Sequence, residues 1–340
     1  MDDNYCLKSL EDRFLMSTLS KLLSHAPSSD RMRRFDARRD LGKVADLVEL
    51  CFTNTLDPDG VRYLQHMRNA ANNPGFLRWA SAAADWSGVP LSGYVWEEND
   101  RLVGNISLIP YIVRTQRYYL IANVAVHPDY RRRGIARQLT LQAMEYAQLH
   151  AANAAWLHVR QDNAAAIDLY QSLHFRERAR RTTWVSQNGI PTSTFLEGLD
   201  IHKHRSPHWK QQRKWLEQLY PPELRWNLPL KIQALNPGIW GRLYRFFTNA
   251  YIWQWSALRR QKLLGVISWQ ATRSYADSLW LAVDPEVEAE VTYALLVHAR
   301  QHLSPRRPLS LDFPVGHASQ AIQAAGFYPQ QTLIWMEYRF

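Results

Sequence analysis

One stretch decides the fold of this chain. It runs from Val124 to Tyr170 and reads VAVHPDYRRRGIARQLTLQAMEYAQLHAANAAWLHVRQDNAAAIDLY. It predicts a strand, a basic turn, a helix, a second strand and a second helix. The first strand, 121–126, is apolar and ends before Pro128, because proline cannot donate a backbone hydrogen bond to a sheet. The stretch therefore indicates a domain in which strands and helices alternate.

The turn after the first strand joins three arginines and a glycine to the start of a helix. Arg131 to Arg133 come directly before Gly134, and apolar residues recur at helical spacing from Ile135 onward. A helix N-terminus favours an anion, because its first N–H groups are free and its dipole is positive there. Glycine lets the backbone approach a phosphate, and arginine adds charge-assisted hydrogen bonds. We interpret the turn as a pyrophosphate site.

Two familiar phosphate-binding motifs do not fit this turn. The P-loop needs Gly-Lys-Ser/Thr, and the dinucleotide fingerprint needs two further glycines. The turn resembles the Arg/Gln-x-x-Gly-x-Gly/Ala turn of the GNAT superfamily of N-acetyltransferases, with Arg131, Gly134 and Ala136 in the three positions. A second motif strengthens the resemblance, because Asn163-x-x-Ala-x-x-x-Tyr170 followed by Ser-Leu-His-Phe looks like the family's other signature.

The resemblance implies the fold class. It predicts an α/β protein of the α+β type, in which a mixed, mostly antiparallel twisted sheet is flanked by helices. The residue pattern agrees with the order β-α-α-β-β-β-α-β-α-β-β. We predict a first strand at 33–37 and a helix at 41–52 with Asp40 as its N-cap.

A weaker copy of the same pattern recurs later in the chain, in the same order and at similar separations. We therefore predict two tandem domains of one architecture, the alternative being an unrelated α/β domain with accidental matches. The matching pairs are Arg101–Ser107 with Lys262–Ser268, Val124–Pro128 with Leu281–Pro285, and Leu169–Phe175 with Ala321–Phe327.

The second copy lacks the chemistry of the first. In place of the arginine turn it has Glu288-Ala-Glu-Val291, which has no glycine and carries carboxylates that repel phosphate. The counterparts of Tyr170 and Asn163 are Ile322 and, approximately, Val315. We predict an N-terminal extension at 1–30, a catalytic GNAT domain at 31–200, a linker at 201–222 and a degenerate GNAT-like domain at 223–340.

The resemblance also implies acetyl-CoA as co-substrate and no metal. In the family, the strand before the turn splays from its neighbour and its backbone N–H groups hold the pantetheine arm. In this chain that strand is Val124, Ala125 and Val126. Asn163 is assigned to the coenzyme as well. The residues assigned to the pyrophosphate are Arg131, Arg132, Arg133, Gly134, Ile135 and Ala136.

Tyr170 is the predicted general acid. A phenol with a pKa near 10 stays protonated at rest and can reprotonate a leaving thiolate, whose thiol has a pKa near 8.5. The motif spacing from Asn163 fixes its position. The alternative is a tyrosine packed on a helix face with its hydroxyl satisfied.

His158 is the predicted general base. The family subgroup that acetylates protein N-termini has Leu-Glu-Val-Arg here, and its glutamate is the base. This chain reads Leu157-His158-Val159-Arg160, and a neutral histidine can accept a proton. The alternative for His158 is a strand histidine that only fills a polar slot. The competing candidate for the base is an ordered water held by Asn123.

Composition narrows the class of protein and of partner. The chain has 340 residues, 46% hydrophobic and 21% charged, which is a globular composition for about two domains. The net charge of +10 suits a polyanionic coenzyme, and no long basic tract or known module argues for nucleic acid. Cys6 and Cys51 form no metal spacing, which fits a reducing cytoplasm. No apolar run approaches about 18 residues, so no membrane partner is expected.

The sequence thus predicts an acetyl-CoA-dependent N-acetyltransferase that acts by direct attack in a ternary complex. The acceptor is a primary amine, either a peptide N-terminus or a small molecule. Two other functions remain open. One is an acetyl-CoA sensor that recruits a partner, and the other is a tandem transferase that uses aminoacyl-tRNA. The intact arginine turn argues against the second.

Overall fold

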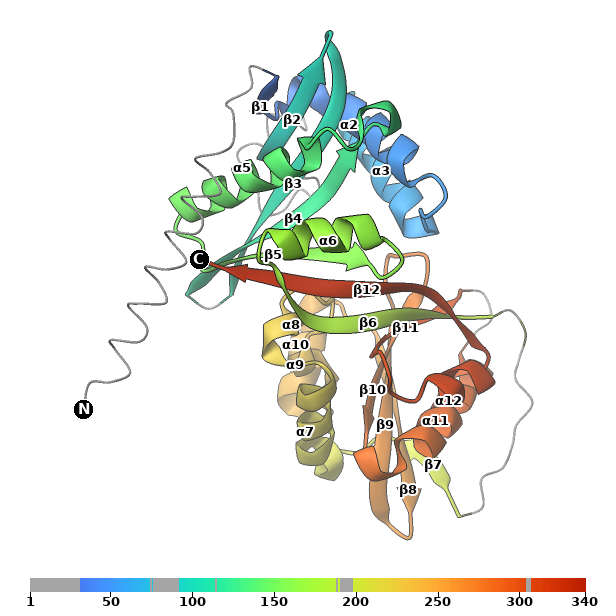
Figure 1. Ribbon diagram of the computed structural model, residues 1–340. Coiled ribbons are helices and arrows are strands. Elements are labelled where there is room, and N and C mark those ends of the chain that lie inside the picture. Colours follow the sequence, from blue (N-terminus) through green and yellow to red (C-terminus); the bar gives the residue numbers. More distant parts are fainter. Residues whose placement is uncertain are drawn as a thin grey trace, which may run out of the picture. The chain divides into compact units, whose positions relative to one another are not determined.

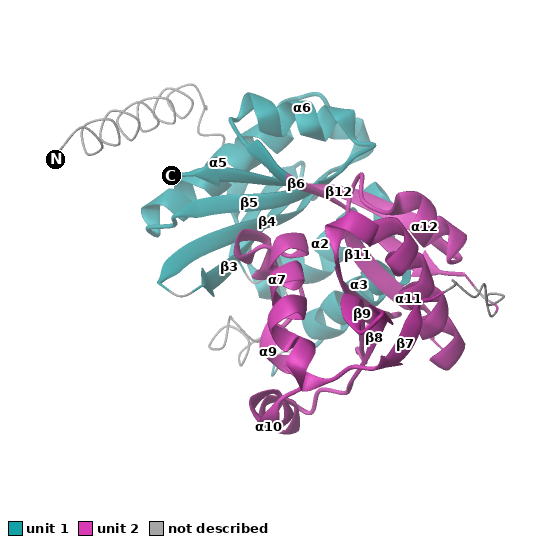
Figure 2. Ribbon diagram, turned by 90° about the horizontal axis from the view of Figure 1, so that it is seen from below, with its two compact units in different colours: residues 1–178, 335–340 teal, residues 179–334 magenta. Residues whose placement is uncertain are grey.

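The computed structural model describes residues 31–73, 75, 92–113, 115–187, 189, 198–303 and 307–340. The N-terminal extension predicted at 1–30 lies outside them. The chain divides into two compact units (Figure 2). Unit 1 comprises the chain up to residue 178 together with 335–340, and unit 2 comprises residues 179–334.

Up to its last helix, unit 1 follows the predicted order of strands and helices (Figure 1). The two strands expected after that helix form one continuous strand, Arg176–Ser186. The elements of unit 1 are β1 (Met32–Arg34), α2 (Ala37–Phe52), α3 (Pro58–Ala71), β2 (Ser92–Glu98), β3 (Arg101–Val113), β4 (Gln116–Val126), the 3-10 turn η1 (Pro128–Tyr130), α5 (Ile135–Leu149), β5 (Ala154–Arg160), α6 (Ala164–Ser172) and the start of β6 (Arg176–Ser186).

The first helix begins earlier than predicted. Asp36, not Asp40, is the N-cap of α2, and its side chain accepts a hydrogen bond from the N–H of Arg38. Asp40 lies within the helix, fully buried, and binds the guanidinium of Arg33 at 2.7 Å. The predicted cap was wrong because Asp40 is needed as the buried partner of a charge on β1.

Helices cover both faces of the sheet in unit 1. The strand order is β1-β2-β3-β4-β5, with β4 and β5 parallel and the preceding pairs antiparallel. Ala125 belongs to the core formed by α2 and α3. Gly104, which pairs with Val126, faces Ile135 and Leu139 of α5. Successive residues of a strand point to opposite faces, so α5 covers the face opposite α2 and α3.

Unit 2 repeats this arrangement with a different set of small helices. Its sheet order is β12-β6-β11-β10-β9-β8-β7. Its elements are β7 (Asp200–Lys203), η2 (Ser206–His208), α7 (Trp209–Leu219), α8 (Pro222–Arg225), α9 (Ile232–Leu235), α10 (Ile239–Thr248), β8 (Ile252–Arg259), β9 (Lys262–Gln270), β10 (Asp277–Val283), η3 (Pro285–Val287), α11 (Glu288–His302), β11 (Leu309–Pro314), α12 (Ser319–Ala324) and β12 (Phe327–Arg339).

Two strands, β6 and β12, each belong partly to both units. The last residues of β12, from Trp335, lie next to β5 in unit 1, and the N–H of Phe340 donates to the carbonyl of Asn153 at 3.3 Å. The units therefore divide within β6, at residue 178. The segment 201–222, which we interpreted as a linker, contains α7, whose Trp215 and Leu216 are buried.

Details of packing show that the two units are copies. Gly104 of β3 and Gly265 of β9 occupy the same place in the repeated sequence. A Cβ on Gly104 would lie 2.9 Å from Ile135, and one on Gly265 would lie 2.6 Å from Val291. In each unit one backbone hydrogen bond follows the end of the corresponding strand, β4 or β10. The N–H of His127 donates to the carbonyl of Val103 at 2.8 Å, and the N–H of Asp284 donates to the carbonyl of Leu264 at 2.9 Å.

The second copy departs from its predicted form at two points. Glu288 to Val291 do not form a turn, because α11 begins at Glu288 directly after η3. The position of the Asn163 cap is taken by Ala318 instead of Val315, because α12 is shorter than α6. Ile322 is fully buried in α12, as a counterpart of Tyr170 should be.

The close approach of helix to strand yields a stability prediction. Gly104→Ala should lower the free energy of unfolding by about 1–3 kcal/mol, because the added methyl group overlaps Ile135, Leu139 and Trp96. Gly42→Ala in α2 is the control, since its Cβ would meet Ala71 at 3.7 Å, an ordinary contact, and alanine favours a helix. Denaturant unfolding measures both, and a Gly104→Ala variant as stable as Gly42→Ala would contradict the packing argument.

Candidate active site

A β-bulge interrupts the strand that leads to the arginine turn. Asn105 pairs with Ala125 and Ser107 pairs with Ala122, so Asn123 and Val124 together face Ile106. Asn123 adopts a positive φ of 49°. An extra residue of this kind bends a strand and ends regular pairing.

Beyond the bulge, β4 separates from β5. Parallel pairing joins Tyr118–Ile121 to Ala154–Leu157 and does not extend to Val124–Val126 in the described residues. Successive N–H groups of a strand point to opposite edges, so those not bonded to β3 face the opening toward β5. This is the splayed edge that the resemblance implied.

A buried polar cluster surrounds the bulge. The Asn123 amide donates to the hydroxyl of Tyr63 at 2.9 Å, and the Asn105 amide donates to the carbonyl of Asn123 at 2.8 Å. Ser107 lies 3.3 Å from the Asn105 amide. Burial raises the pKa of Tyr63. The Oδ1 atom of Asn105 has no hydrogen-bond partner among the described residues, although the residue is only 1% exposed.

Sequence reasoning named Asn123 but missed its three partners. The available signal was the pair Asn105 and Ser107, two polar residues at alternate positions of an otherwise apolar strand. Tyr63 could not have been found this way, because it comes from α3 and its neighbour in space is sixty residues away along the chain.

The arginine turn ends in an open helix N-terminus. Gly134 is the N-cap of α5 with a φ of 77°, and no side chain caps this end of the helix. The N–H groups of Ile135 and Ala136 are thus left without an intrahelical acceptor. Among the described residues other than its two chain neighbours, the atom nearest to the place of a Gly134 Cβ is in the side chain of Gln138, at 3.9 Å. The turn is therefore open enough to admit an anion.

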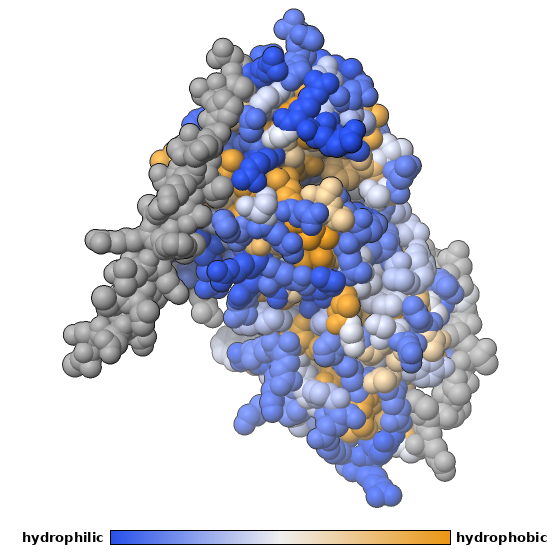
Figure 3. All heavy atoms as spheres, in the orientation of Figure 1, coloured by the Kyte–Doolittle hydropathy of each residue, from blue (hydrophilic) through white to orange (hydrophobic). Residues whose placement is uncertain are grey.

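The three arginines play different parts. Arg131 donates through Nε to the carbonyl of Val126 at 3.2 Å, which ties the turn to the strand edge. Arg133 lies over the ring of Tyr130 at 4.8 Å and is 3.7 Å from Glu98. Arg132 is exposed and forms no ion pair within the part of the chain that the structure describes. The surface over this end of unit 1 is strongly hydrophilic (Figure 3).

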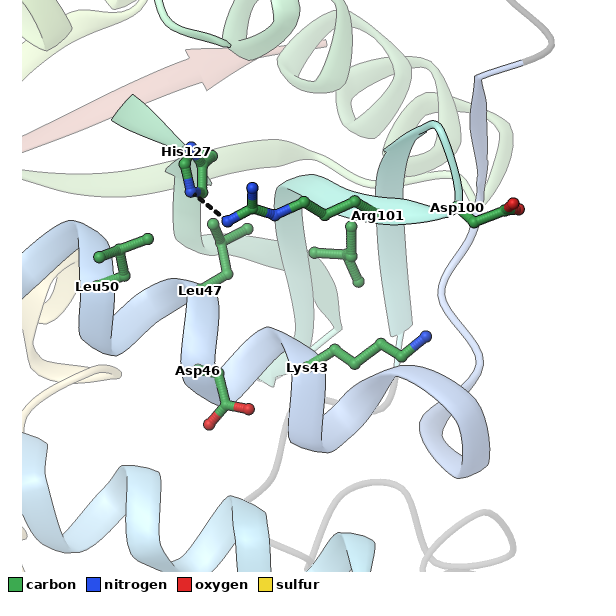
Figure 4. Close-up of a pocket in the computed structure, with 8 residues that line it drawn as sticks. Lys43, Asp46, Leu47, Leu50, Asp100, Arg101 and His127 are labelled. Atoms are coloured by element: carbon green, nitrogen blue, oxygen red, sulfur yellow. Dashed lines mark hydrogen bonds between the residues drawn. The ribbon is translucent and has the colours of Figure 1, made fainter. Parts of the chain in front are cut away.

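A small pocket lies next to the turn, between α2 and the start of β3. Its volume is about 310 Å³ (Figure 4). Arg101 points into it and approaches Nε2 of His127 at 2.7 Å. Lys43 and Asp46 of α2 also line it, so its walls carry both signs of charge.

The helix after β5 carries the other predicted motif. Asn163 is the N-cap of α6, and its Oδ1 accepts a hydrogen bond from the N–H of Ala166 at 3.2 Å. Tyr170 is 6% exposed, packs edge-on against Phe175, and has its pKa raised by burial. Arg137 in the first turn of α5 donates to Ser172 at 3.0 Å, which connects the arginine turn to the helix of Tyr170.

His158 lies one residue past the last pairing between β4 and β5, at the mouth of the opening. Its ring stacks on Trp335 of β12 with 4.2 Å between centroids. Burial lowers the pKa of His158 to about 4. The imidazole is therefore neutral at pH 7, but it is a weaker base than an exposed histidine. The stacking partner could not have been predicted, because it lies at the far end of the chain.

This part of the chain matches a known family. Residues 47–175 match the model of the acetyltransferase (GNAT) family. The matched range includes the bulge, the arginine turn and the helix of Tyr170. The chain therefore carries a GNAT domain in its first unit, which confirms the resemblance of the two motifs.

The alignments with individual curated proteins cover a shorter part of the chain. The chain is 42% identical over 62 residues to the ribosomal protein bS18 alanine N-acetyltransferases of Escherichia coli K12 and Salmonella typhimurium. The aligned part is 18% of this chain and 42% of each relative, so it spans less than half the length of those proteins.

Solved structures resemble the whole chain. A tandem GNAT protein from the clavulanic acid biosynthesis pathway is 16% identical, with 91% of this chain and 98% of that one covered and a TM-score of 0.50. A GCN5-related N-acetyltransferase from Sphaerobacter thermophilus is 15% identical, with 92% and 96% covered and a TM-score of 0.57. At these identities the likeness concerns the fold, and it confirms the predicted tandem GNAT architecture.

Proposed function

We propose that this protein is an acetyl-CoA-dependent N-acetyltransferase that passes an acetyl group to a primary amine by direct attack in a ternary complex. One observation carries the proposal: the splayed edge at Val124–Val126 leads directly into the uncapped N-terminus of α5. A strand edge and an anion site in series suit a long coenzyme with a pyrophosphate. The match of this unit to the GNAT family supports the same activity.

On the acyl-donor side, groups of this chain are proposed to bind and orient acetyl-CoA. The backbone of Gly134, Ile135 and Ala136 is proposed to bind the pyrophosphate, assisted by Arg131, Arg132 and Arg133. The N–H groups of Val124 to Val126 are proposed to hold the pantetheine arm and polarise the carbonyl. Asn163 is proposed to contact the coenzyme through its amide NH₂, since its Oδ1 is already used to cap α6. When bound, acetyl-CoA supplies an activated acyl group.

Tyr170 is proposed as the general acid. Burial raises its pKa, so the phenol holds its proton at neutral and mildly alkaline pH. The phenol is thus protonated when the thiolate leaves and can donate its proton to the sulfur. The alternative role, packing alone, is compatible with the edge-on contact to Phe175.

Two groups compete for the role of base. His158 is neutral at pH 7, but its pKa of about 4 makes it a weak acceptor of a proton. The cluster around Asn123 is proposed as the other route, with a water bound between its amide and hydroxyl groups. The unpaired Oδ1 of Asn105 favours this route, because a buried acceptor calls for a donor such as water or an incoming amine.

The acceptor is proposed to be a peptide N-terminus or a small-molecule amine. The printed name of the curated relatives, an alanine N-acetyltransferase of a ribosomal protein, favours a peptide. The tandem architecture favours a small molecule, as in two-domain enzymes of thiol-cofactor synthesis. A thiol-release assay with alanine-initiated peptides and a panel of small amines separates the two.

The phosphate site predicts a loss of coenzyme affinity in one variant. Arg132→Ala should weaken acetyl-CoA binding roughly tenfold to a hundredfold, because a charge-assisted hydrogen bond contributes about 1.5–3 kcal/mol. Calorimetric titration of the full chain measures this. Arg38→Ala, an exposed arginine of α2, is the control and should bind as the wild type does. Equal affinities for both variants would rule out the turn as the phosphate site.

The acid assignment predicts a loss of turnover alone. Tyr170→Phe keeps the buried ring but removes the proton, so kcat should fall about 10²–10⁴-fold while the affinity for acetyl-CoA is retained. Thiol release and calorimetry measure the two quantities on the same preparation. If kcat is unchanged with binding intact, Tyr170 is a packing residue and the protein needs another acid.

The base assignment predicts the position of the acidic limb in the pH–rate profile. Since burial lowers the pKa of His158, the imidazole becomes protonated only as pH falls through about 4. If His158 is the base, kcat drops near that pH and His158→Ala removes the limb. Asn123→Ala is the matched variant. A limb that survives in His158→Ala, with kcat lowered in Asn123→Ala, assigns proton removal to the water held at the bulge.

A further inference from the structure

Helix α10 of unit 2 turns its apolar face outward. Five large apolar side chains lie within an arc of about 120° on a helix that advances about 100° per residue. These residues are Ile239 at 69% exposure, Trp240 at 77%, Leu243 at 42%, Phe246 at 81% and Phe247 at 80%. A surface helix normally buries such a stripe, so the orientation needs an explanation.

The opposite side of α10 is fastened to its own unit. A Cβ on Gly241 would come within 1.9 Å of the carbonyl oxygen of Asn236, so only glycine permits this contact. Arg245 donates to the carbonyls of Ala234 and Asn236 at 2.7 and 2.8 Å. The polar side of the helix is therefore used for attachment. The apolar side is presented to the outside by specific contacts.

The apolar face continues into the strand that follows. Tyr251 is 65% exposed and Trp253 is 56% exposed, at the start of β8. Figure 2 shows α10 at the periphery of unit 2. We call the set Ile239, Trp240, Leu243, Phe246, Phe247, Tyr251 and Trp253 the α10 face.

The segment of the sequence that contains α10 is basic. Residues 224–276 contain no aspartate or glutamate and eight lysines and arginines. Among the described ion pairs, Arg259 binds Glu290. Arg242 borders the apolar arc and is exposed. The cations of this segment are Arg225, Lys231, Arg242, Arg245, Arg259, Arg260, Lys262 and Arg273.

We propose that unit 2 binds the surface of an anionic lipid bilayer through the α10 face. Exposed tryptophan, tyrosine and phenylalanine beside aliphatic residues, with basic surroundings, are typical of helices that lie in the bilayer interface. Nucleic acid fits less well, because Ile239 and Leu243 offer neither stacking nor hydrogen bonds. None of the helices in the described ranges is long and apolar enough to span a bilayer, so the contact is peripheral. The proposal is independent of acetyl transfer.

Vesicle flotation with the full chain tests the proposal. One set of vesicles is phosphatidylcholine alone, and the other is phosphatidylcholine mixed with phosphatidylglycerol. The wild type should float with the anionic set and dissociate as salt is raised, since exposed charges are screened. Trp240→Ser with Phe247→Ser should lower the bound fraction at least tenfold, because two large side chains no longer enter the interface.

A matched control distinguishes binding through the α10 face from non-specific binding by exposed apolar side chains. Ile112→Ser with Leu149→Ser removes two equally exposed apolar side chains from unit 1, at 67% and 77%, and should leave vesicle binding unchanged. Three results overturn the proposal: no flotation of the wild type with anionic vesicles, flotation of the Trp240 and Phe247 variant at the wild-type level, or equal loss in the control. Sedimentation velocity without lipid identifies a second copy as the occupant if the same variant abolishes a dimer.

Discussion

The first unit depends on one extra residue in a strand. Because β4 has Asn123 and Val124 where β3 has only Ile106, the strand bends and leaves β5 beyond Ile121. The backbone N–H groups that a regular sheet would use are then available at its edge. The same bend brings the amide of Asn123 to Tyr63 and directs the chain into the turn that Arg131 ties to Val126. The open edge, the polar cluster and the position of the arginine turn thus share one cause.

Unit 2 has the same architecture but lacks the bulge in the corresponding strand. Its β10 pairs with β9 in unbroken register from Ser278 to Val283, so no residue is bulged. Its central helix starts at Glu288 without a glycine turn, and Glu288 and Glu290 occupy the first turn, where the helix dipole favours their carboxylates. Glu290 pairs with Arg259 and Glu288 lies 3.1 Å from His317, so the start of this helix is negatively charged where the arginine turn of unit 1 is positive. The second copy therefore keeps the packing of the fold, with Gly265 against Val291, and has carboxylates at the position of the arginine turn.

The sequence predicts well what is local and poorly what depends on partners in space. The arginine turn, the helix after it and the helix that carries Tyr170 follow from residue types at fixed spacing, and the structure has them. The bulge could not be predicted, because one asparagine in an apolar strand does not reveal which residue faces it. The Asp36 cap was missed for a related reason, since only the structure shows that Asp40 is held by Arg33. The sequence analysis did not predict α10, and the outward direction of its apolar side is visible only in the structure.

The placement of β12 has the largest consequence for the proposed chemistry. A strand at the end of the second sequence repeat contributes Trp335 to the first unit, where its ring packs against one side of the His158 imidazole. A charged glutamate at this position would be costly beneath an indole, because burial disfavours a charge without a partner. A neutral histidine is compatible with that environment. The environment of His158 thus depends on the tandem architecture, and a fragment that ends after β6 would lack both the strand and this environment.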